Sequence, residues 1–171
     1  MIRALVQGEP ICVRNPNATR PWQHVLEPSS GYLALATALH TCPGELRLDS
    51  AFNIGPNEDA NQPVRQLVET ALQHWPGSWQ SEAHPLGPHE AALLQLDASK
   101  IGAVVGWRPA WRFPEAVGRT VAWYRDVTGS LVSDVTRRTR ADIHDYEAAA
   151  AHLAIPWACG VAVRAGSGHD G

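Results

Sequence analysis

The chain has 171 residues, of which 44% are hydrophobic and 18% are charged, a composition typical of one globular domain rather than a disordered segment. Fourteen basic and seventeen acidic side chains give a formal net charge of -3, which disfavours nucleic acid or an anionic membrane as a partner. No apolar run reaches the roughly 18 residues that a membrane span requires. Three widely spaced cysteines and the lack of a signal peptide predict a cytoplasmic protein without a disulfide framework.

The pattern of apolar residues predicts helices and short strands in a mixed α/β order. The clearest helix runs from Pro63 to Trp75, where apolar side chains recur at i, i+3, i+4 and i+7. A helix further upstream can be capped by Ser29 or Ser30. In chain order, the predicted elements are a helix end over 2–6, a strand over 11–13, a helix over 32–40, extended chain over 46–54, a helix over 63–75, a strand over 79–82, a loop over 83–90, extended chain over 93–96, helices over 99–105, 114–127 and 141–153, and a disordered tail beyond Pro156.

Several chemical motifs are incomplete. The final glycines match GxGxxG, but no helix follows them to bind a dinucleotide. His89 begins a run that resembles HExxH, but Leu93 replaces the second histidine, so no zinc site is expected. Lys100 is the single lysine, and Leu96 stands four residues before it, so the sequence contains no Tyr-x-x-x-Lys pair. No catalytic or metal-ligating residue is therefore predicted.

Other conspicuous residues are assigned structural roles. The pairs His24 with Glu27 and His144 with Glu147 have the i, i+3 spacing of solvated neighbours on a helix. Aromatic side chains near strand ends and on helix faces belong more often to a core or a subunit contact than to a ligand site. The tryptophans assigned to packing on this basis are Trp22, Trp107, Trp111 and Trp123.

The strongest family signal is the block GEPICVRNPNATRPWQHVLEP over residues 8–28, which resembles the CDP-glucose 4,6-dehydratases, nucleotide-sugar enzymes of the extended short-chain dehydrogenase/reductase superfamily. The resemblance extends from about residue 2 to about residue 148. The further motifs that carry it are FNIGPN over 52–57, PHEA over 88–91, LDASK over 96–100, GWRP over 106–109 and TVAWY over 120–124.

The resemblance implies an α/β fold that corresponds to the C-terminal substrate-binding portion of such an enzyme, with residues 1–148 as a nucleotide-sugar-binding region and 149–171 as a helix end and tail. In the family, an N-terminal Rossmann half binds NAD and supplies the Tyr and Lys that oxidise the sugar. Neither feature has a counterpart in this sequence. The chain is therefore expected to lack that half, to hold no cofactor itself, and to be inactive alone.

The resemblance also implies a binding site for CDP-glucose or a related nucleotide sugar. Arg20 is predicted to contact the pyrophosphate, because a planar guanidinium gives bidentate, charge-assisted bonds to phosphate oxygens. The alternative for Arg20 is an ordinary surface arginine in the loop that it shares with Arg14. Arg14 and Asn15 are predicted to meet the nucleotide, and His89 and Glu90 the phosphate or ribose.

Three interpretations of the whole chain remain open. It is the substrate-binding part of a dehydratase that converts CDP-glucose to CDP-4-keto-6-deoxyglucose, with a separate chain carrying the Rossmann half as a partner. Alternatively, it is a non-catalytic nucleotide-sugar-binding module, or a truncated remnant without function. A fragment is expected to leave apolar surface exposed where the missing half would lie, whereas a module is not. The sequence does not predict the oligomeric state.

Overall fold

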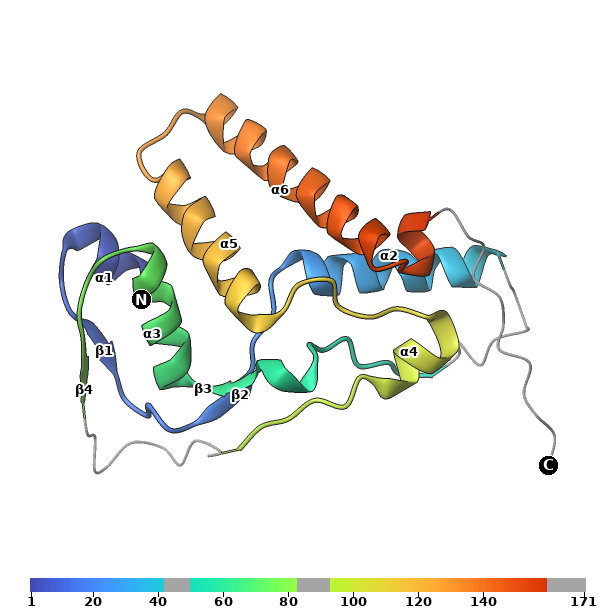
Figure 1. Cartoon of the computed structure of the whole chain (residues 1–171), viewed down its shortest axis with the longest axis horizontal. Helices are drawn as coiled ribbons and strands as arrows, with labels where there is room; N and C mark the ends of the chain where they lie inside the picture. The colour runs from blue at the N-terminus through green and yellow to red at the C-terminus, as the bar shows by residue number, and fades with distance from the viewer. Residues whose placement is uncertain (42–49, 83–92, 160–171) are drawn as a thin grey trace.

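The computed structural model describes residues 1–41, 50–82 and 93–159 (Figure 1). Helices and short strands alternate along the chain, which confirms the predicted mixed α/β class. The elements are α1 (Ile2–Gln7), β1 (Ile11–Val13), β2 (Thr19–Pro21), α2 (Leu26–Thr41), η1 (Glu58–Ala60), β3 (Asn61–Pro63), α3 (Val64–His74), β4 (Trp79–Ser81), α4 (Ser99–Val105), α5 (Phe113–Val127), α6 (Val132–His152) and η2 (Pro156–Cys159).

Two small sheets and pairwise contacts between helices organise the described chain. Strand β1 pairs with β4 in parallel, and β2 pairs with β3 in antiparallel orientation. Helix α3 connects β3 to β4 and packs against α5, which in turn packs against α6 (Figure 1). Helices α2 and α4 contact each other near the C-terminal end of α6. None of the helices in the described part has both the length and the apolar character needed to cross a bilayer.

Apolar side chains gather in three clusters rather than in one continuous core. The first lies under β1 and includes Val68 of α3. The second lies between α3 and α5, where Ala71 meets Val117. The third lies between α2 and α4, where Ile101 and Trp107 are almost fully buried. Each cluster joins neighbouring elements, so the chain depends on packing at several small interfaces.

Most of the short predicted elements are confirmed. The helices predicted over 63–75, 99–105 and 114–127 begin and end within one residue of α3, α4 and α5. The strands predicted over 11–13 and 79–82 correspond to β1 and β4. Gly8 and Gly106 end α1 and α4 with φ angles of 69° and 72°, a left-handed conformation that glycine adopts without a Cβ clash.

Helix α2 begins at Leu26, so the predicted cap at Ser29 or Ser30 is wrong. The side chain of His24 replaces it, because its Nδ1 accepts a hydrogen bond of 3.3 Å from the Leu26 backbone N–H. Ser30 lies inside the helix and donates to the carbonyl of Glu27. Sequence preferences favour serine as a cap, and they give little weight to a histidine that lies before the first turn.

Helix α6 begins at Val132, nine residues before the predicted start at 141. Its first half is polar and therefore lacks the apolar periodicity by which a helix is recognised. Ion pairs stabilise this first half of the helix instead. Arg137 pairs with Asp134 at 3.0 Å, and Arg138 contacts both Asp142 on the same helix and Asp126 of α5.

Two extended segments were predicted where the described chain has no strand. Residues 50–54 and 93–96 have no β-partner in the described part of the chain, and residues 46–49 lie outside it. Residues 156–159 form the 3-10 helix η2, where a disordered tail was predicted, because Trp157 stacks on Tyr146 with ring centroids 6.0 Å apart. The rest of the predicted tail, 160–171, and the predicted loop over 83–90 lie outside the described residues.

Candidate functional site

The loop between β1 and β2 carries the predicted basic residues. Arg14 and Asn15 follow directly after β1, as predicted, and Arg14 is exposed. Arg20 was predicted in the loop but is the middle residue of β2, because β3 lies alongside and pairs Arg20 with Gln62. The half-buried Arg20 donates from its guanidinium to the Thr19 carbonyl at 2.7 Å. His89 and Glu90 lie outside the described residues.

The start of helix α3 fixes the shape of this loop. The backbone N–H of Val64 donates to the Ala18 carbonyl at 3.0 Å, and that of Arg65 donates to the Pro16 carbonyl at 2.9 Å. The Arg65 guanidinium reaches Asn17 Oδ1 at 3.3 Å. Backbone hydrogen bonds to Pro16 and Ala18 therefore hold the loop against the start of α3. Arg65 adds a positive charge beside this loop, which carries Arg14 and is followed by Arg20 in β2. We call residues 14–18 the basic loop, because these three guanidinium groups make it suitable for an anion.

Two buried polar atoms of the β2–β3 pair have no partner among the described residues, namely Thr19 Oγ1 and Asn61 Oδ1, and Arg20 projects from the other face of this pair. The β2–β3 register places Thr19 opposite Pro63 and Asn61 opposite Pro21, so the two side chains lie on the same face of the strand pair. Buried polar atoms are nearly always hydrogen-bonded in folded proteins. A polar ligand at this face would supply the missing partners. No sequence motif singled out Asn61.

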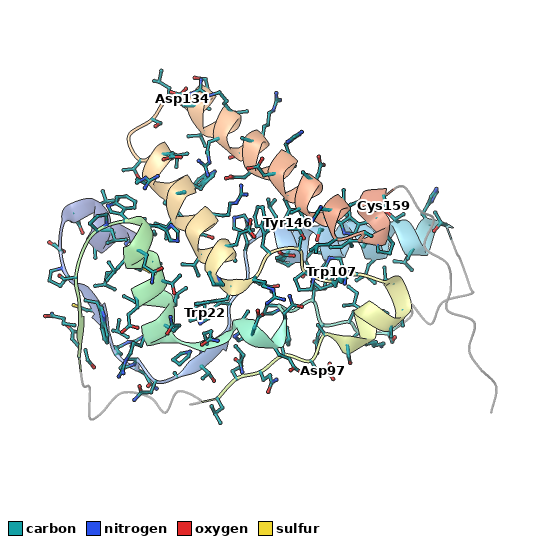
Figure 2. All side chains as sticks on the ribbon, in the orientation of Figure 1. Trp22, Asp97, Trp107, Asp134, Tyr146 and Cys159 are labelled. Atoms are coloured by element: carbon teal, nitrogen blue, oxygen red, sulfur yellow. The ribbon has the colours of Figure 1, made fainter. Side chains whose placement is uncertain are left out.

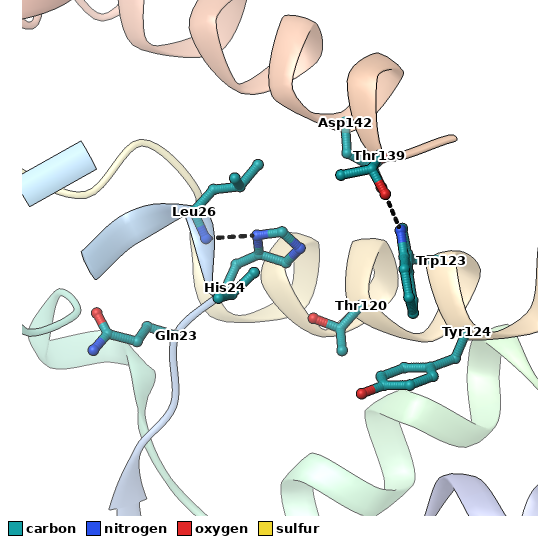
Figure 3. Close-up of a pocket in the computed structure, with 9 residues that line it drawn as sticks. Gln23, His24, Leu26, Thr120, Trp123, Tyr124, Thr139 and Asp142 are labelled. Carbon is teal, nitrogen blue, oxygen red and sulfur yellow. Dashed lines mark hydrogen bonds between the residues drawn. The ribbon is translucent and has the colours of Figure 1, made fainter. Parts of the chain in front are cut away.

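A second feature is a cavity of about 470 Å³ next to His24 (Figure 3). Trp123 forms one wall, and its indole N–H donates to Thr139 Oγ1 at 3.0 Å. Figure 3 shows the His24 ring on the opposite side of the cavity from Trp123. The lining residues are Gln23, His24, Val25 and Leu26 before and at the start of α2, Thr120, Trp123 and Tyr124 of α5, and Thr139 and Asp142 of α6.

His24 was predicted to be one half of a solvated pair with Glu27, but both side chains are buried. Burial lowers the pKa of His24 to about 4, with Asp142 opposing the shift and Arg119 adding to it. The ring is therefore neutral at physiological pH. Its Nδ1 accepts from Leu26, so the proton lies on Nε2. The other predicted pair, His144 with Glu147, is exposed on α6 as expected.

The low pKa of His24 makes stability depend on pH. Between the unfolded value of 6.5 and about 4, only the unfolded chain binds the extra proton, so the free energy of unfolding falls as the pH drops. The expected slope approaches about 1.4 kcal/mol per pH unit. The variant His24→Asn should lose this pH dependence of stability, while the asparagine amide oxygen can still accept the hydrogen bond from the Leu26 N–H. Urea unfolding of both proteins across this window tests the point, and parallel pH profiles would contradict it.

Glu27 is 1% exposed and anchors three distant parts of the chain. Its carboxylate accepts backbone hydrogen bonds from Trp111 at 2.8 Å and Ala110 at 3.0 Å, and a third from the Tyr146 hydroxyl at 2.6 Å. Burial raises the pKa of Glu27 and, more strongly, that of Tyr146, whose hydroxyl therefore stays protonated. Because protein groups occupy both oxygens, Glu27 is a structural anchor rather than a general acid or base.

Ser30 extends this network to the third apolar cluster. Its hydroxyl lies 2.8 Å from the Tyr146 hydroxyl and accepts from the Trp107 indole N–H at 2.9 Å. Figure 2 shows Trp107 and Tyr146 on either side of helix α2. Trp111 packs edge-on against Tyr146 at 5.0 Å. The packing role predicted for Trp107 and Trp111 is confirmed by their burial.

The side chain of Lys100 also makes structural contacts. Its amino group donates to Ser50 Oγ at 2.7 Å and to the Ala51 carbonyl at 2.9 Å, and it lies 4.5 Å from the centre of the Phe52 ring. Within the described residues, no group of three or more His, Cys, Asp or Glu side chains is arranged to hold a metal ion. The basic loop and the cavity beside His24 are two features of the described residues that are available for a ligand.

Comparison with known proteins shows what this chain is similar to. No family model matches the sequence. The chain is 34% identical over 154 residues to CDP-glucose 4,6-dehydratase of Salmonella typhimurium, a match that covers 87% of this chain. The chain is homologous to part of that dehydratase. The predicted resemblance is thereby confirmed, and the match fits the C-terminal part of the relative. The chain spans 41% of the length of this curated relative.

The dehydratase-like motifs converge in the folded chain although they are far apart in the sequence. Parts of the motifs over 52–57, 96–100 and 106–109 together line a cavity of about 590 Å³. The contact is close, since a Cβ on Gly55 would lie 2.8 Å from a methyl carbon of Leu96. The block over 8–28 supplies the basic loop, His24 and Glu27. The resemblance to the dehydratase therefore covers both the framework and the candidate ligand site.

Proposed function

We propose that this chain is the nucleotide-sugar-binding part of a CDP-glucose 4,6-dehydratase and that its basic loop binds the diphosphate of CDP-glucose. The observation that carries the proposal is the positive charge around this loop, with Arg14 at its start, Arg65 bonded to its Asn17 and Arg20 in the strand that follows it. A diphosphate offers charged acceptors for these guanidinium groups.

The remaining predicted residues take secondary roles in this proposal. Arg14 and Asn15 lie at the start of the same loop and are assigned to the nucleotide. His89 and Glu90 keep their assignment to the phosphate or ribose as an expectation from the resemblance. Arg65 joins them as a further source of positive charge, because its backbone and guanidinium both contact the loop.

The redox step of a dehydratase is assigned to another part of the enzyme. The residues of this chain do not fit an NAD site, because Lys100 hydrogen bonds to Ser50 and Ala51, and the sequence has no Tyr-x-x-x-Lys. Conversion of CDP-glucose to CDP-4-keto-6-deoxyglucose would then require a partner half that supplies NAD and the oxidising residues. The 171-residue chain alone is expected to bind the nucleotide sugar without converting it.

Calorimetric titration of the purified chain tests this proposal. CDP and CDP-glucose are expected to bind saturably, while UDP serves as the control for the base and glucose as the control for the sugar. Preference for the cytidine ligands supports a retained nucleotide-sugar site. A folded chain that gives no binding heat with either cytidine ligand would contradict the proposal and favour a remnant without function.

Removal of the Arg20 guanidinium should weaken CDP binding. Loss of a charge-assisted hydrogen bond costs about 1.5–3 kcal/mol, which corresponds to about a 10- to 150-fold higher Kd for Arg20→Ala. Arg137→Ala is the matched control, since it removes the same charge from an exposed position on α6. Equal CDP affinity in the two variants would show that Arg20 does not contact the diphosphate.

A further inference from the structure

The cavity beside His24 has no role in the proposed diphosphate site, because none of its lining residues belongs to the basic loop. Its volume of about 470 Å³ lies within the range of about 300–1,000 Å³ that is usual for small-molecule sites. Its walls come from three separate parts of the chain, namely the segment that leads into α2, helix α5 and helix α6. Aromatic and aliphatic side chains lie there beside a few polar groups, which is the usual composition of a ligand pocket.

Trp123 gives this cavity a flat aromatic wall whose orientation is fixed. Its indole N–H donates to Thr139 Oγ1 at 3.0 Å, and the Tyr124 ring meets it edge-on with the ring centroids 5.1 Å apart. Figure 3 shows the indole from its edge, with its flat side turned toward His24 across the cavity. Aromatic rings attract each other in offset-stacked or edge-to-face arrangements. A planar aromatic ligand is therefore the shape that this wall favours.

His24 presents a hydrogen-bond donor from the opposite side of the cavity. Its side chain is 6% exposed, and its ring packs edge-on against Trp111 with the ring centroids 4.8 Å apart. Because Nδ1 accepts from the Leu26 backbone, the proton lies on Nε2. No described residue accepts from this Nε2–H, and Figure 3 shows that edge of the ring directed toward Trp123. Buried polar groups are nearly always hydrogen-bonded, so an acceptor on a ligand fits this position.

Thr139 brings a second donor to the Trp123 side of the cavity. The neighbouring threonines Thr120 and Thr136 donate their hydroxyl protons to backbone carbonyls four residues earlier, at 2.8 and 3.1 Å. The Thr139 hydroxyl instead accepts from Trp123, and no described residue accepts its proton. A hydroxyl can accept and donate at the same time. The cavity therefore holds two unused donors on opposite sides.

The charges at the cavity are compensated within the protein. Asp142 is the carboxylate in the lining, and the Arg138 guanidinium contacts both of its oxygens, at 3.0 and 3.2 Å. Burial lowers the pKa of His24 to about 4, so its ring is neutral at physiological pH. A charged ligand would lose its hydration here without gaining a counter-ion. The ligand that fits this cavity is therefore neutral.

We propose that the cavity beside His24 binds a neutral, planar heteroaromatic molecule, which stacks on Trp123 and accepts hydrogen bonds from His24 Nε2–H and the Thr139 hydroxyl. Acceptor atoms on two opposite edges of a fused ring pair match the two donors. A nucleotide sugar carries a charged diphosphate and does not fit this description, so the site is separate from the basic loop. Because the walls come from three parts of the chain, the bound ligand joins them and raises the temperature of thermal unfolding.

Nuclear magnetic resonance with three probes of the same two-ring shape tests this proposal. Naphthalene has no acceptor nitrogen, quinoline has one, and quinoxaline has two that point in opposite directions. Titration of the full chain with quinoxaline should shift the indole N–H signal of Trp123 and saturate. Thr139→Val should raise the Kd of quinoxaline about two- to tenfold, because one neutral hydrogen bond is lost, and should leave the Kd of naphthalene unchanged. Thr136→Val, on the same helix but outside the cavity, is the matched control.

His24→Phe gives a second comparison, because it keeps a ring but removes the Nε2–H, and it should weaken quinoxaline more than naphthalene. If this variant does not fold, Thr139→Val decides the proposal alone. Absence of a saturable shift with quinoxaline, or equal quinoxaline affinity in Thr139→Val and Thr136→Val, would overturn the site. An equal loss of naphthalene affinity in Thr139→Val would overturn the hydrogen bond. Thr139→Val should bind CDP like the wild type, and competition between CDP and quinoxaline would contradict a separate site.

Discussion

Replacement of Glu27 by alanine is expected to lower the free energy of unfolding by about 3–6 kcal/mol. The change leaves the backbone N–H groups of Ala110 and Trp111 and the hydroxyl of Tyr146 without their acceptor in a buried site. Each buried donor that loses its partner costs about 1–3 kcal/mol. The relief of burying a carboxylate offsets part of this sum, as the raised pKa of Glu27 indicates.

Urea unfolding followed by circular dichroism measures this effect. Glu27→Gln should fall between wild type and alanine, because its single amide oxygen can replace only part of the carboxylate. Glu147→Ala is the control, since Glu147 is exposed on α6 and its loss should change stability by less than about 0.5 kcal/mol. If Glu27→Ala were as stable as Glu147→Ala, the anchoring role of Glu27 would be wrong.

Replacement of Trp107 by alanine should cost a comparable amount, about 3–5 kcal/mol. The side chain is 2% exposed and fills the apolar cluster between α2 and α4. Its removal leaves a cavity that neighbouring alanines are too small to fill. The indole N–H also donates to Ser30 Oγ, so part of the loss comes from a hydrogen bond.

Trp107→Phe separates these two contributions. It keeps an aromatic ring in the cluster but removes the donor to Ser30, so a smaller loss of about 1–2 kcal/mol is expected. The midpoints of urea unfolding for the two variants give the comparison. Equal destabilisation by phenylalanine and alanine would mean that the hydrogen bond, rather than packing volume, explains the role of Trp107.

Patterns over a few neighbouring residues predicted those helices and strands that depend on interactions between near neighbours in the chain. Helix α3 has a clear apolar stripe, and glycine ends α1 and α4 in the conformation that it favours. The predicted starts of α2 and α6 were wrong. The observed starts depend on a histidine side chain and on ion pairs between helices, and neither leaves a periodic pattern in the sequence. The strand predicted over 46–54 is not assigned in its described part, because strands also need a neighbour.

The candidate site was predictable only where a single residue type carried the chemistry. Arg20 was chosen because its guanidinium lies within the dehydratase-like block over 8–28, and its phosphate contact stays a prediction. Thr19 and Asn61 were not, because their relevance comes from burial without a partner. Glu27 was interpreted wrongly as a solvated residue. Its partners Ala110 and Tyr146 lie 83 and 119 positions away, and no local pattern contains them.

The network around Glu27 and Ser30 has a consequence for how the protein is made. Ser30 lies 116 positions before the Tyr146 hydroxyl that it contacts. At about 5–20 residues per second, a ribosome needs about 6–23 s to synthesise the intervening chain. During that interval, the carboxylate of Glu27 and the hydroxyl of Ser30 in helix α2 lack their contacts with the Tyr146 hydroxyl. Helix α2 is therefore the segment of the nascent chain where chaperones have the longest opportunity to bind.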